Sequence, residues 1–424
     1  MRGVKVVHYS LEVLNRLSKI QEDKDVKALS HAIFPGTHCP LFGVALTASY
    51  IEDVAMLVVG TSECTYYTKV FSNHRQKNED KVYSLVLKEK DVVFGAQEKV
   101  MEAAKYIKEL ENPAGIMVVT TCVPELIGED YEGIRSDIED QVGIPVFVVK
   151  TEHYKCSSHI PGMKRALASL INAMESQEER SGINILGHRG HGVENTELYR
   201  LLCENGIRIN TIIPSKCKLE EIKAAPKAKL NIVTDMIALD LAEAMKKKFN
   251  TPYIFFDKHM NKEIILANYA AIGEFLSIDI VEEVQKLKKE YEELFSKTKE
   301  VLGGKRFIYA NTPMMAFETA EFLVELGMVP KMIQIRELYD IDIKWKDMIL
   351  EAGFDPYVTR IANIAPMRYL YDDMEADIYI GHENPMLLKS KGIAQITLDS
   401  NAQNIGFELP IGVMKTLLER IGEV

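Results

Sequence analysis

Three cysteines stand where the sequence predicts that a loop passes into a helix. Cys39 lies in residues 37–41 (THCPL), Cys64 in residues 60–67 (GTSECTYY) and Cys122 in residues 120–125 (TTCVPE). Thiolates at such junctions serve mainly as ligands of soft metals or as nucleophiles. Metal binding is therefore the first chemistry to consider for this chain.

A shared iron–sulfur cluster is the sharper hypothesis for these three residues, because thiolates are the usual ligands of such clusters. Pro40 and Pro124 would stiffen two of the three loops. The spacing is not a short metal motif such as a CxxC pair. Free cysteine is also among the most buried residue types, so three unrelated buried thiols remain the alternative from the residues alone.

The other cysteines are less informative. Cys156 follows a predicted strand and is an alternative fourth ligand, as are the hydroxyls of Ser157 and Ser158; a loop thiol without a metal role is equally compatible. Cys203 falls inside a predicted helix and is expected in the core. Cys217 lies on a predicted loop.

Two histidine-bearing loops are candidates for a substrate site. Residues 187–192 (GHRGHG) form a glycine-rich strand-to-helix loop, in which His188 and His191 could bind a metal or a carboxylate. The glycine spacing differs from the dinucleotide fingerprint, and a solvated turn is the alternative. His382 occupies the matching loop of the last third of the chain. Two such loops that face a cleft between domains suggest a ligand site.

Alternating strands and helices would position these residues. Residues 54–59, 115–119 and 144–149 each read as a buried strand that runs into a polar loop and then a helix. This order is typical of a parallel sheet. Ligands of such sheets bind at the carboxyl ends of the strands, where Cys64 and Cys122 fall.

The same pattern recurs along the whole chain and predicts an α/β protein of three tandem doubly wound parallel-sheet (Rossmann-like) domains. We expect an iron–sulfur domain over residues 1–180 and a second domain over 181–302 that ends in a long connecting helix at about 280–301. A third domain is expected over 303–424.

Composition narrows the function classes. The chain has 424 residues, 47% hydrophobic, and a formal net charge of −11, which disfavours a nucleic-acid surface. The sequence contains no run of about 18 apolar residues, so it predicts no membrane-spanning helix. Its start also lacks the apolar core of a signal peptide. We therefore expect a cytoplasmic protein whose thiols are reduced. The sequence has no P-loop, so ATP chemistry would come from a partner.

Residues 36–165 resemble component 1 of nitrogenase and its relatives. The resemblance rests on Cys39-Pro40-Leu41-Phe42-Gly43 as a first cluster loop and on Gly60 through Cys64 as a second. It also rests on residues 93–97 (VFGAQ) as the Val-Phe-Gly-Gly box and, most specifically, on residues 120–130 as the third cluster loop. It continues more faintly through the rest of the chain.

The resemblance implies an oxidoreductase that pairs with a homologous or identical component 1 subunit, as a dimer or tetramer. Cys39, Cys64 and Cys122 would hold a 4Fe-4S or larger shared cluster, and a separate ATP-hydrolysing iron protein would deliver low-potential electrons to it. A deeper site, holding a second metal or a tetrapyrrole, would reduce the substrate.

Two departures from nitrogenase itself stand out. Asp235 occupies the position of the cysteine that anchors the molybdenum–iron cofactor, and residues 399–407 lack the histidine that completes the anchor. The resemblance therefore argues against dinitrogen as substrate. His188, His191, Asp235 and His382 are the substrate-binding candidates.

Three functions follow from the sequence. The first is a nitrogenase-like reductase, with a tetrapyrrole as the leading substrate class. The alternative is a cofactor-assembly scaffold of the same fold that carries a metal-cluster precursor without turnover. A ligand-binding module with inert thiols is the third.

Overall fold

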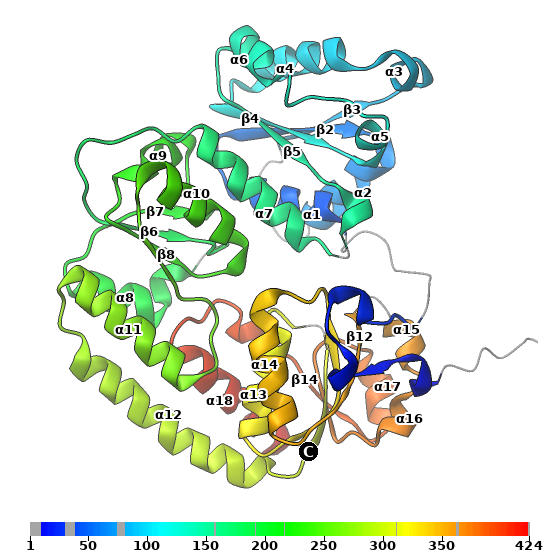
Figure 1. The fold of residues 1–424 in the computed structure, drawn as a ribbon, viewed down its shortest axis with the longest axis vertical. Coiled ribbons are helices and arrows are strands. Elements are labelled where there is room, and N and C mark those ends of the chain that lie inside the picture. Colours follow the sequence, from blue (N-terminus) through cyan, green and yellow to red (C-terminus); the bar gives the residue numbers. More distant parts are fainter. Residues whose placement is uncertain are drawn as a thin grey trace, which may run out of the picture. The chain divides into compact units, whose positions relative to one another are not determined.

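The computed structural model describes residues 10–29, 39–73, 81–156, 158–190, 192–215, 217–310, 312–361 and 364–422. These residues form two compact units. Unit 1 contains the described parts of residues 1–34, 196–198 and 258–424, and unit 2 contains those of residues 35–195 and 199–257. Figure 1 shows the elements of each unit along the chain.

Unit 2 begins with a four-stranded sheet in the order β3-β2-β4-β5, in which all neighbours run parallel. β2 and β4 are buried along their whole length and read as continuous apolar runs, as expected for strands covered on both faces. The strands are β3 (Val82–Val86), β2 (Val54–Gly60), β4 (Gly115–Thr120) and β5 (Val146–Lys150).

Helices cover both faces of this sheet. Ala55 and Leu57 of β2 pack in one core with α4 and α6, whereas Met56 and Val58 pack in another core with α1 and α7. This division follows from the two-residue period of a strand. The helices in this part of the chain are α1 (Pro40–Ala48), α2 (Ser62–Asn73), α3 (Glu89–Phe94), α4 (Gln97–Glu111), α5 (Cys122–Leu126), α6 (Arg135–Val142) and α7 (Ile160–Ser169).

A second parallel sheet completes unit 2, in the order β7-β6-β8-β9. It shares a core with the first sheet, because α10 packs against α7. Its strands are β6 (Ile183–Leu186), β7 (Ile209–Ile213), β8 (Leu230–Val233) and β9 (Tyr253–Phe255). The helices that follow them along the chain are α8 (Glu197–Glu204), α9 (Leu219–Ala224), η8 (Met236–Ala238) and α10 (Leu239–Phe249).

Unit 1 contains the third sheet, in the order β1-β12-β11-β10-β13-β14. All its pairs are parallel except β1 with β12. Its strands are β1 (Asn15–Arg16), β10 (Arg306–Tyr309), β11 (Val329–Ile335), β12 (Tyr357–Arg360), β13 (Ile378–Ile380) and β14 (Ala394–Ile396). Its helices are α11 (Lys262–Leu276), α12 (Val281–Leu302), α13 (Ala316–Glu325), α14 (Asp340–Glu351), α15 (Ile364–Met367), α16 (Tyr371–Met374), α17 (Pro385–Ser390) and α18 (Glu408–Gly422).

The beginning of the described chain belongs to this third sheet, although the sequence assigns it to the first domain. Asp23 forms an ion pair with Arg360 at the end of β12, and the backbone N–H of Leu17 donates to the carbonyl of Pro356. A short antiparallel edge strand has no sequence period of its own, so this return contact is a finding of the structure.

The predicted α/β class with parallel sheets is confirmed, and the long charged helix predicted at 280–301 is α12. Among the described residues no helix is both long and apolar enough to cross a membrane.

Candidate metal centre

Cys39, Cys64 and Cys122 occupy the starts of three helices in unit 2. Cys39 is the N-cap of α1, Cys64 lies in the first turn of α2, and Cys122 is the first residue of α5. α2 and α5 follow β2 and β4, which are neighbours, so Cys64 and Cys122 lie at the carboxyl edge of the same sheet. All three thiols are partly buried.

The pKa shifts of Cys39 and Cys122 include contributions from the other thiols of this set. Burial raises the pKa of Cys39 to about 11, and the thiols of Cys122 and Cys64 contribute to the rise. Burial is also the main cause that raises the pKa of Cys122. The nearby thiol of Cys64 and the carboxylate of Glu125 raise it further. Three thiolates would repel one another here, so a cationic centre between them is what would stabilise their ionised forms.

Each sulfur also has a nearby hydrogen-bonding group. The hydroxyl of Thr61 lies 3.4 Å from Sγ of Cys64, and Nδ1 of His153 lies 3.5 Å from Sγ of Cys122. The backbone N–H groups of Leu41 and Phe42 act on the thiol of Cys39 and favour its ionised form. Donors of this kind are what a metal-bound thiolate requires.

Two glycines allow close contacts to the residues next to Cys122 and Cys39. A Cβ atom on Gly60, at the end of β2, would come within 2.0 Å of Oγ1 of Thr121, the residue before Cys122. A Cβ atom on Gly162 of α7 would come within 1.9 Å of the carbonyl oxygen of Pro40, the residue after Cys39. Glycine at both positions is what lets these segments lie so close together.

The three candidate ligands are all thiols, the donor type that iron–sulfur clusters use. In the described part of the chain, no three His, Cys, Asp or Glu side chains are grouped as ligands of one metal ion. The cysteines of an iron–sulfur cluster bind different irons and are therefore spread more widely than the ligands of one ion. Soft thiolates such as those of Cys39, Cys64 and Cys122 are the ligands that such a cluster prefers.

Of the fourth-ligand candidates, Cys156 and Ser158 are among the described residues. The thiol of Cys156 contacts Nη1 of Arg165 at 3.5 Å and the carbonyl of Thr151 at 3.9 Å. Ser158 is buried, and its hydroxyl accepts the backbone N–H of Ile160, whereas Ser157 lies outside the described residues. Cys203 is exposed rather than in the core, because its helix turns it to solvent, and Cys217 is buried.

The predicted substrate residues are divided between the units. In unit 2, Asp235 caps η8 and its carboxylate lies 3.4 Å from Nη2 of Arg189, a partner that the sequence reasoning missed. His188, the residue before Arg189, is buried, and His191 lies outside the described residues. In unit 1, Nε2 of His382 lies 2.8 Å from Oδ2 of Asp399.

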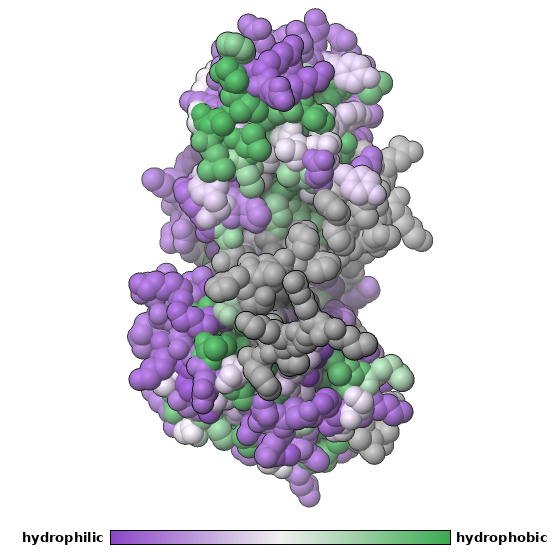
Figure 2. Space-filling view, turned by 90° about the vertical axis from the view of Figure 1, so that its right-hand side faces the viewer, coloured by the Kyte–Doolittle hydropathy of each residue, from purple (hydrophilic) through white to green (hydrophobic). Residues whose placement is uncertain are grey.

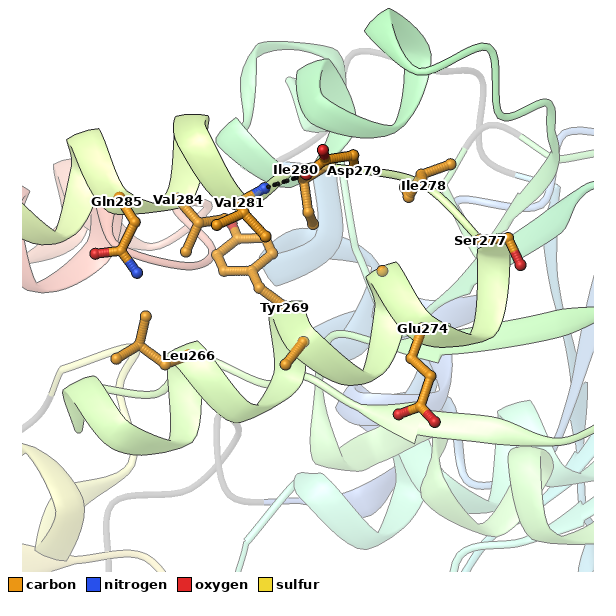
Figure 3. A pocket seen from close by; sticks show the side chains of 12 residues that line it. Leu266, Tyr269, Glu274, Ser277, Ile278, Asp279, Ile280, Val281, Val284 and Gln285 are labelled. Carbon is orange, nitrogen blue, oxygen red and sulfur yellow. Dashed lines mark hydrogen bonds between the residues drawn. The ribbon is translucent and has the colours of Figure 1, made fainter.

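A separate pocket of about 720 Å³ lies in unit 1 between α11 and α12 (Figure 3). Leu266, Ile280 and Val284 line it, together with Tyr269, whose hydroxyl donates to Glu197. It presents no thiol or histidine, so the cysteines remain the candidate centre.

Comparison with known proteins decides the family. The family model "Nitrogenase component 1 type Oxidoreductase" matches residues 39–398. The chain belongs to the nitrogenase component 1 family. Its matched segment begins at Cys39 itself and includes all three cysteines.

Individual relatives agree with this family. The chain is 27% identical to the nitrogenase iron-molybdenum cofactor biosynthesis protein NifE of Clostridium pasteurianum over 83% of this chain and 79% of that protein. It is 29% identical to the nitrogenase molybdenum-iron protein alpha chain of the same organism over 48% of this chain and 41% of that protein. The solved structure of nitrogenase Cp1 at pH 6.5 shares the fold, with a TM-score of 0.80 at 20% identity over 94% of this chain and 95% of that one.

The component 1 chain also presents exposed apolar side chains on unit 2. Val93 and Phe94 at the end of α3 are 71% and 87% exposed, and Leu126 at the end of α5 is 69% exposed. Tyr66 in α2 is exposed as well. Figure 2 shows hydrophobic side chains gathered on this side of unit 2. Such a patch is typical of a protein–protein interface.

Sequence reasoning missed two residues of the centre. Glu125 and His153 both lie in segments that contain a candidate cysteine ligand. A glutamate or a histidine in such a segment does not by itself indicate a role. Their position after β4 and β5, at the same sheet edge as Cys64 and Cys122, is the signal that could have found them.

Proposed function

We propose that this chain holds an iron–sulfur cluster through Cys39, Cys64 and Cys122, and that it serves as a scaffold subunit in the assembly of a metal cofactor. One observation carries the cluster site. Among three thiols from separate helix starts, the pKa values of Cys39 and Cys122 are raised in part by other thiols of the set, and two of the three, Cys64 and Cys122, lie at the carboxyl edge of one parallel sheet.

Each residue of the proposed cluster site would have its own role in binding the cluster. The three thiolates would bind the irons, while Thr61, His153 and the start of α1 would provide donors toward the sulfurs. Glu125 would hold the α5 and β5 loops together. When bound, the cluster would supply one-electron transfer at low potential.

The scaffold role is supported by the relatives. A protein named for iron-molybdenum cofactor biosynthesis aligns over 83% of the chain, whereas the molybdenum-iron protein alpha chain of the same organism aligns over 48%. On this proposal a cofactor precursor would occupy the region near His188, His191 and Asp235.

A reductase is the second candidate, and Asp235 favours it. A metal–sulfur precursor would be anchored best by a soft thiolate, and this position carries a carboxylate paired with Arg189. A reductase of this family would use the same cluster and reduce a bound substrate such as a tetrapyrrole.

The exposed patch of Val93, Phe94 and Leu126 would receive partners in either case. We propose that a homologous or identical subunit, and an ATP-hydrolysing iron protein as electron donor, dock on this side of unit 2. A partner thiol or Cys156 would complete the ligand set.

Two assays on the anaerobically reconstituted protein separate the candidates. Incubation with an apo-acceptor protein should transfer a metal–sulfur cofactor without multiple turnover if the chain is a scaffold. Multiple turnover of a tetrapyrrole with an iron protein and ATP would instead establish the reductase.

A further inference from the structure

His153 lies against the sulfur of a proposed cluster ligand. Its Nδ1 atom is 3.5 Å from Sγ of Cys122, and the residue begins the short helix η4 (His153–Lys155) just after β5. The ring is exposed, so burial does not force it into this place. Its position must come from the backbone that carries it.

That backbone is held by several interactions. Glu152, the residue before His153, adopts a left-handed conformation with φ 44° and ψ 44°, which residues other than glycine seldom adopt. Its backbone N–H donates to Oε2 of Glu125 at 2.8 Å, and its side chain lies 2.9 Å from Nη2 of Arg165. Strained backbone persists where surrounding contacts over-determine it, and it clusters at functional sites.

The chemistry of the bound state fixes the direction of the hydrogen bond. A neutral thiol could donate to the ring, but a thiolate that binds iron has no proton to give. The proton between Sγ and Nδ1 must then belong to the histidine. The Nδ1–H tautomer is the one that fits a metal-bound Cys122.

We propose that His153 donates an N–H···S hydrogen bond to the cluster-bound thiolate of Cys122 and thereby raises the reduction potential of the cluster. The inference rests on the proposed cluster site. Hydrogen bonds to the sulfurs stabilise the more negative, reduced form and so move the potential upward. His153 is a positioning residue in this account, since it acts through Cys122 and binds no iron itself.

The first test uses the reconstituted wild-type protein labelled with ¹⁵N-histidine. Pulsed electron paramagnetic resonance of the reduced cluster should show a weak histidine nitrogen coupling, which disappears in His153→Leu. A strong coupling typical of a directly bound imidazole would overturn the proposal, and so would the lack of any coupling. Whether a weak coupling exists is decided in the wild-type protein alone; its assignment to His153 uses a His153→Leu sample whose cluster signal shows that the variant has assembled.

The second test is a redox titration of the cluster. His153→Leu should lower the midpoint potential, and His153→Gln, which keeps an N–H donor, should restore part of the shift. Tyr154→Phe, a change in the same short helix, is the matched control and should leave the potential unchanged. Equal potentials in wild type and His153→Leu would overturn the inference alone, whereas a wild-type protein that binds no iron would overturn the proposed cluster site.

Discussion

The carboxylate of Glu125 accepts the backbone N–H of Thr151 at a distance of 2.6 Å. It also accepts the hydroxyl of Thr120 at 2.5 Å and the backbone N–H of Glu152 at 2.8 Å. One side chain, three residues after Cys122, therefore joins the end of β4 to the loop that carries His153 and Cys156. The geometry of the proposed centre depends on this link.

Replacing Glu125 by Gln should destabilise the protein by about 1–3 kcal/mol. The amide nitrogen that replaces one oxygen would face a backbone N–H, so at least one donor would lose its acceptor. Urea unfolding should show a lower midpoint, together with weaker iron retention. Glu132→Gln, which alters an exposed ion pair with Arg135, is the control and should change stability by less than about 1 kcal/mol. Equal losses in both variants would contradict the role proposed for Glu125.

Gly60→Ala should also be destabilising. The new methyl group would lie 2.0 Å from Oγ1 of Thr121, and overpacking of this kind costs about 1–3 kcal/mol. Thermal unfolding measures the effect. Gly273→Ala in α11 provides a matched control, because its nearest contact would be the carbonyl of Ile278 at 3.3 Å. A Gly60→Ala protein as stable as the Gly273→Ala protein would show that β2 and α5 do not approach so closely.

Much of this fold could be predicted from the sequence. Continuous apolar runs such as β2 and β4 identify buried parallel strands, and the polar residues after them mark the ligand edge. β3 was missed because it is only half-buried. β1 was missed because two residues carry no period, and because its partner strand β12 lies at the other end of the chain.

The candidate site was only partly predictable. The places of Cys64 and Cys122 after buried strands can be predicted from residue type and element order, and the mutual approach of these two cysteines follows from the parallel pairing of β2 and β4. His153 and Glu125 act through atoms that meet only after folding. The pairing of Arg189 with Asp235 is likewise a contact between loops that no local pattern encodes.

Unit 1 should lose stability as the pH rises from about 4.5 through 7. Burial raises the pKa of Glu197 to about 7, although donors from Tyr269, Phe407 and Glu408 oppose the shift. The unfolded chain then ionises Glu197 at lower pH than the folded chain, so the stability that the bound proton gives the folded state is lost between about pH 4.5 and 7 and is gone above that range. At most about 3 kcal/mol is involved.

Urea unfolding at pH 5 and pH 8 measures this effect. Glu197→Gln should be less stable than wild type at pH 5, because one backbone N–H loses its acceptor, but it should show a smaller change between the two pH values. Glu300→Gln on α12 should keep the wild-type pH dependence. A wild-type protein that gains stability over this range would contradict the expected loss.

Phe94→Ser should weaken docking of the proposed partners without lowering stability. Phe94 is 87% exposed, so its ring gains little from folding and is free to contribute to an interface. Sedimentation analysis with a purified iron protein or partner subunit measures the association. Tyr106→Ser on α4, another exposed aromatic, is the control and should bind normally. Equal partner binding by the Phe94→Ser and Tyr106→Ser proteins would contradict a role of Phe94 in the interface.

Iron and acid-labile sulfide content after anaerobic reconstitution tests the central claim most directly. The wild-type protein and the Cys203→Ser control should bind iron and sulfide and absorb visible light through thiolate-to-iron charge transfer. The triple variant Cys39→Ser, Cys64→Ser, Cys122→Ser should be colourless and iron-free while it remains folded. A triple variant that binds as much iron as the wild type, or a wild type that binds none, would contradict a cluster held by these three thiolates.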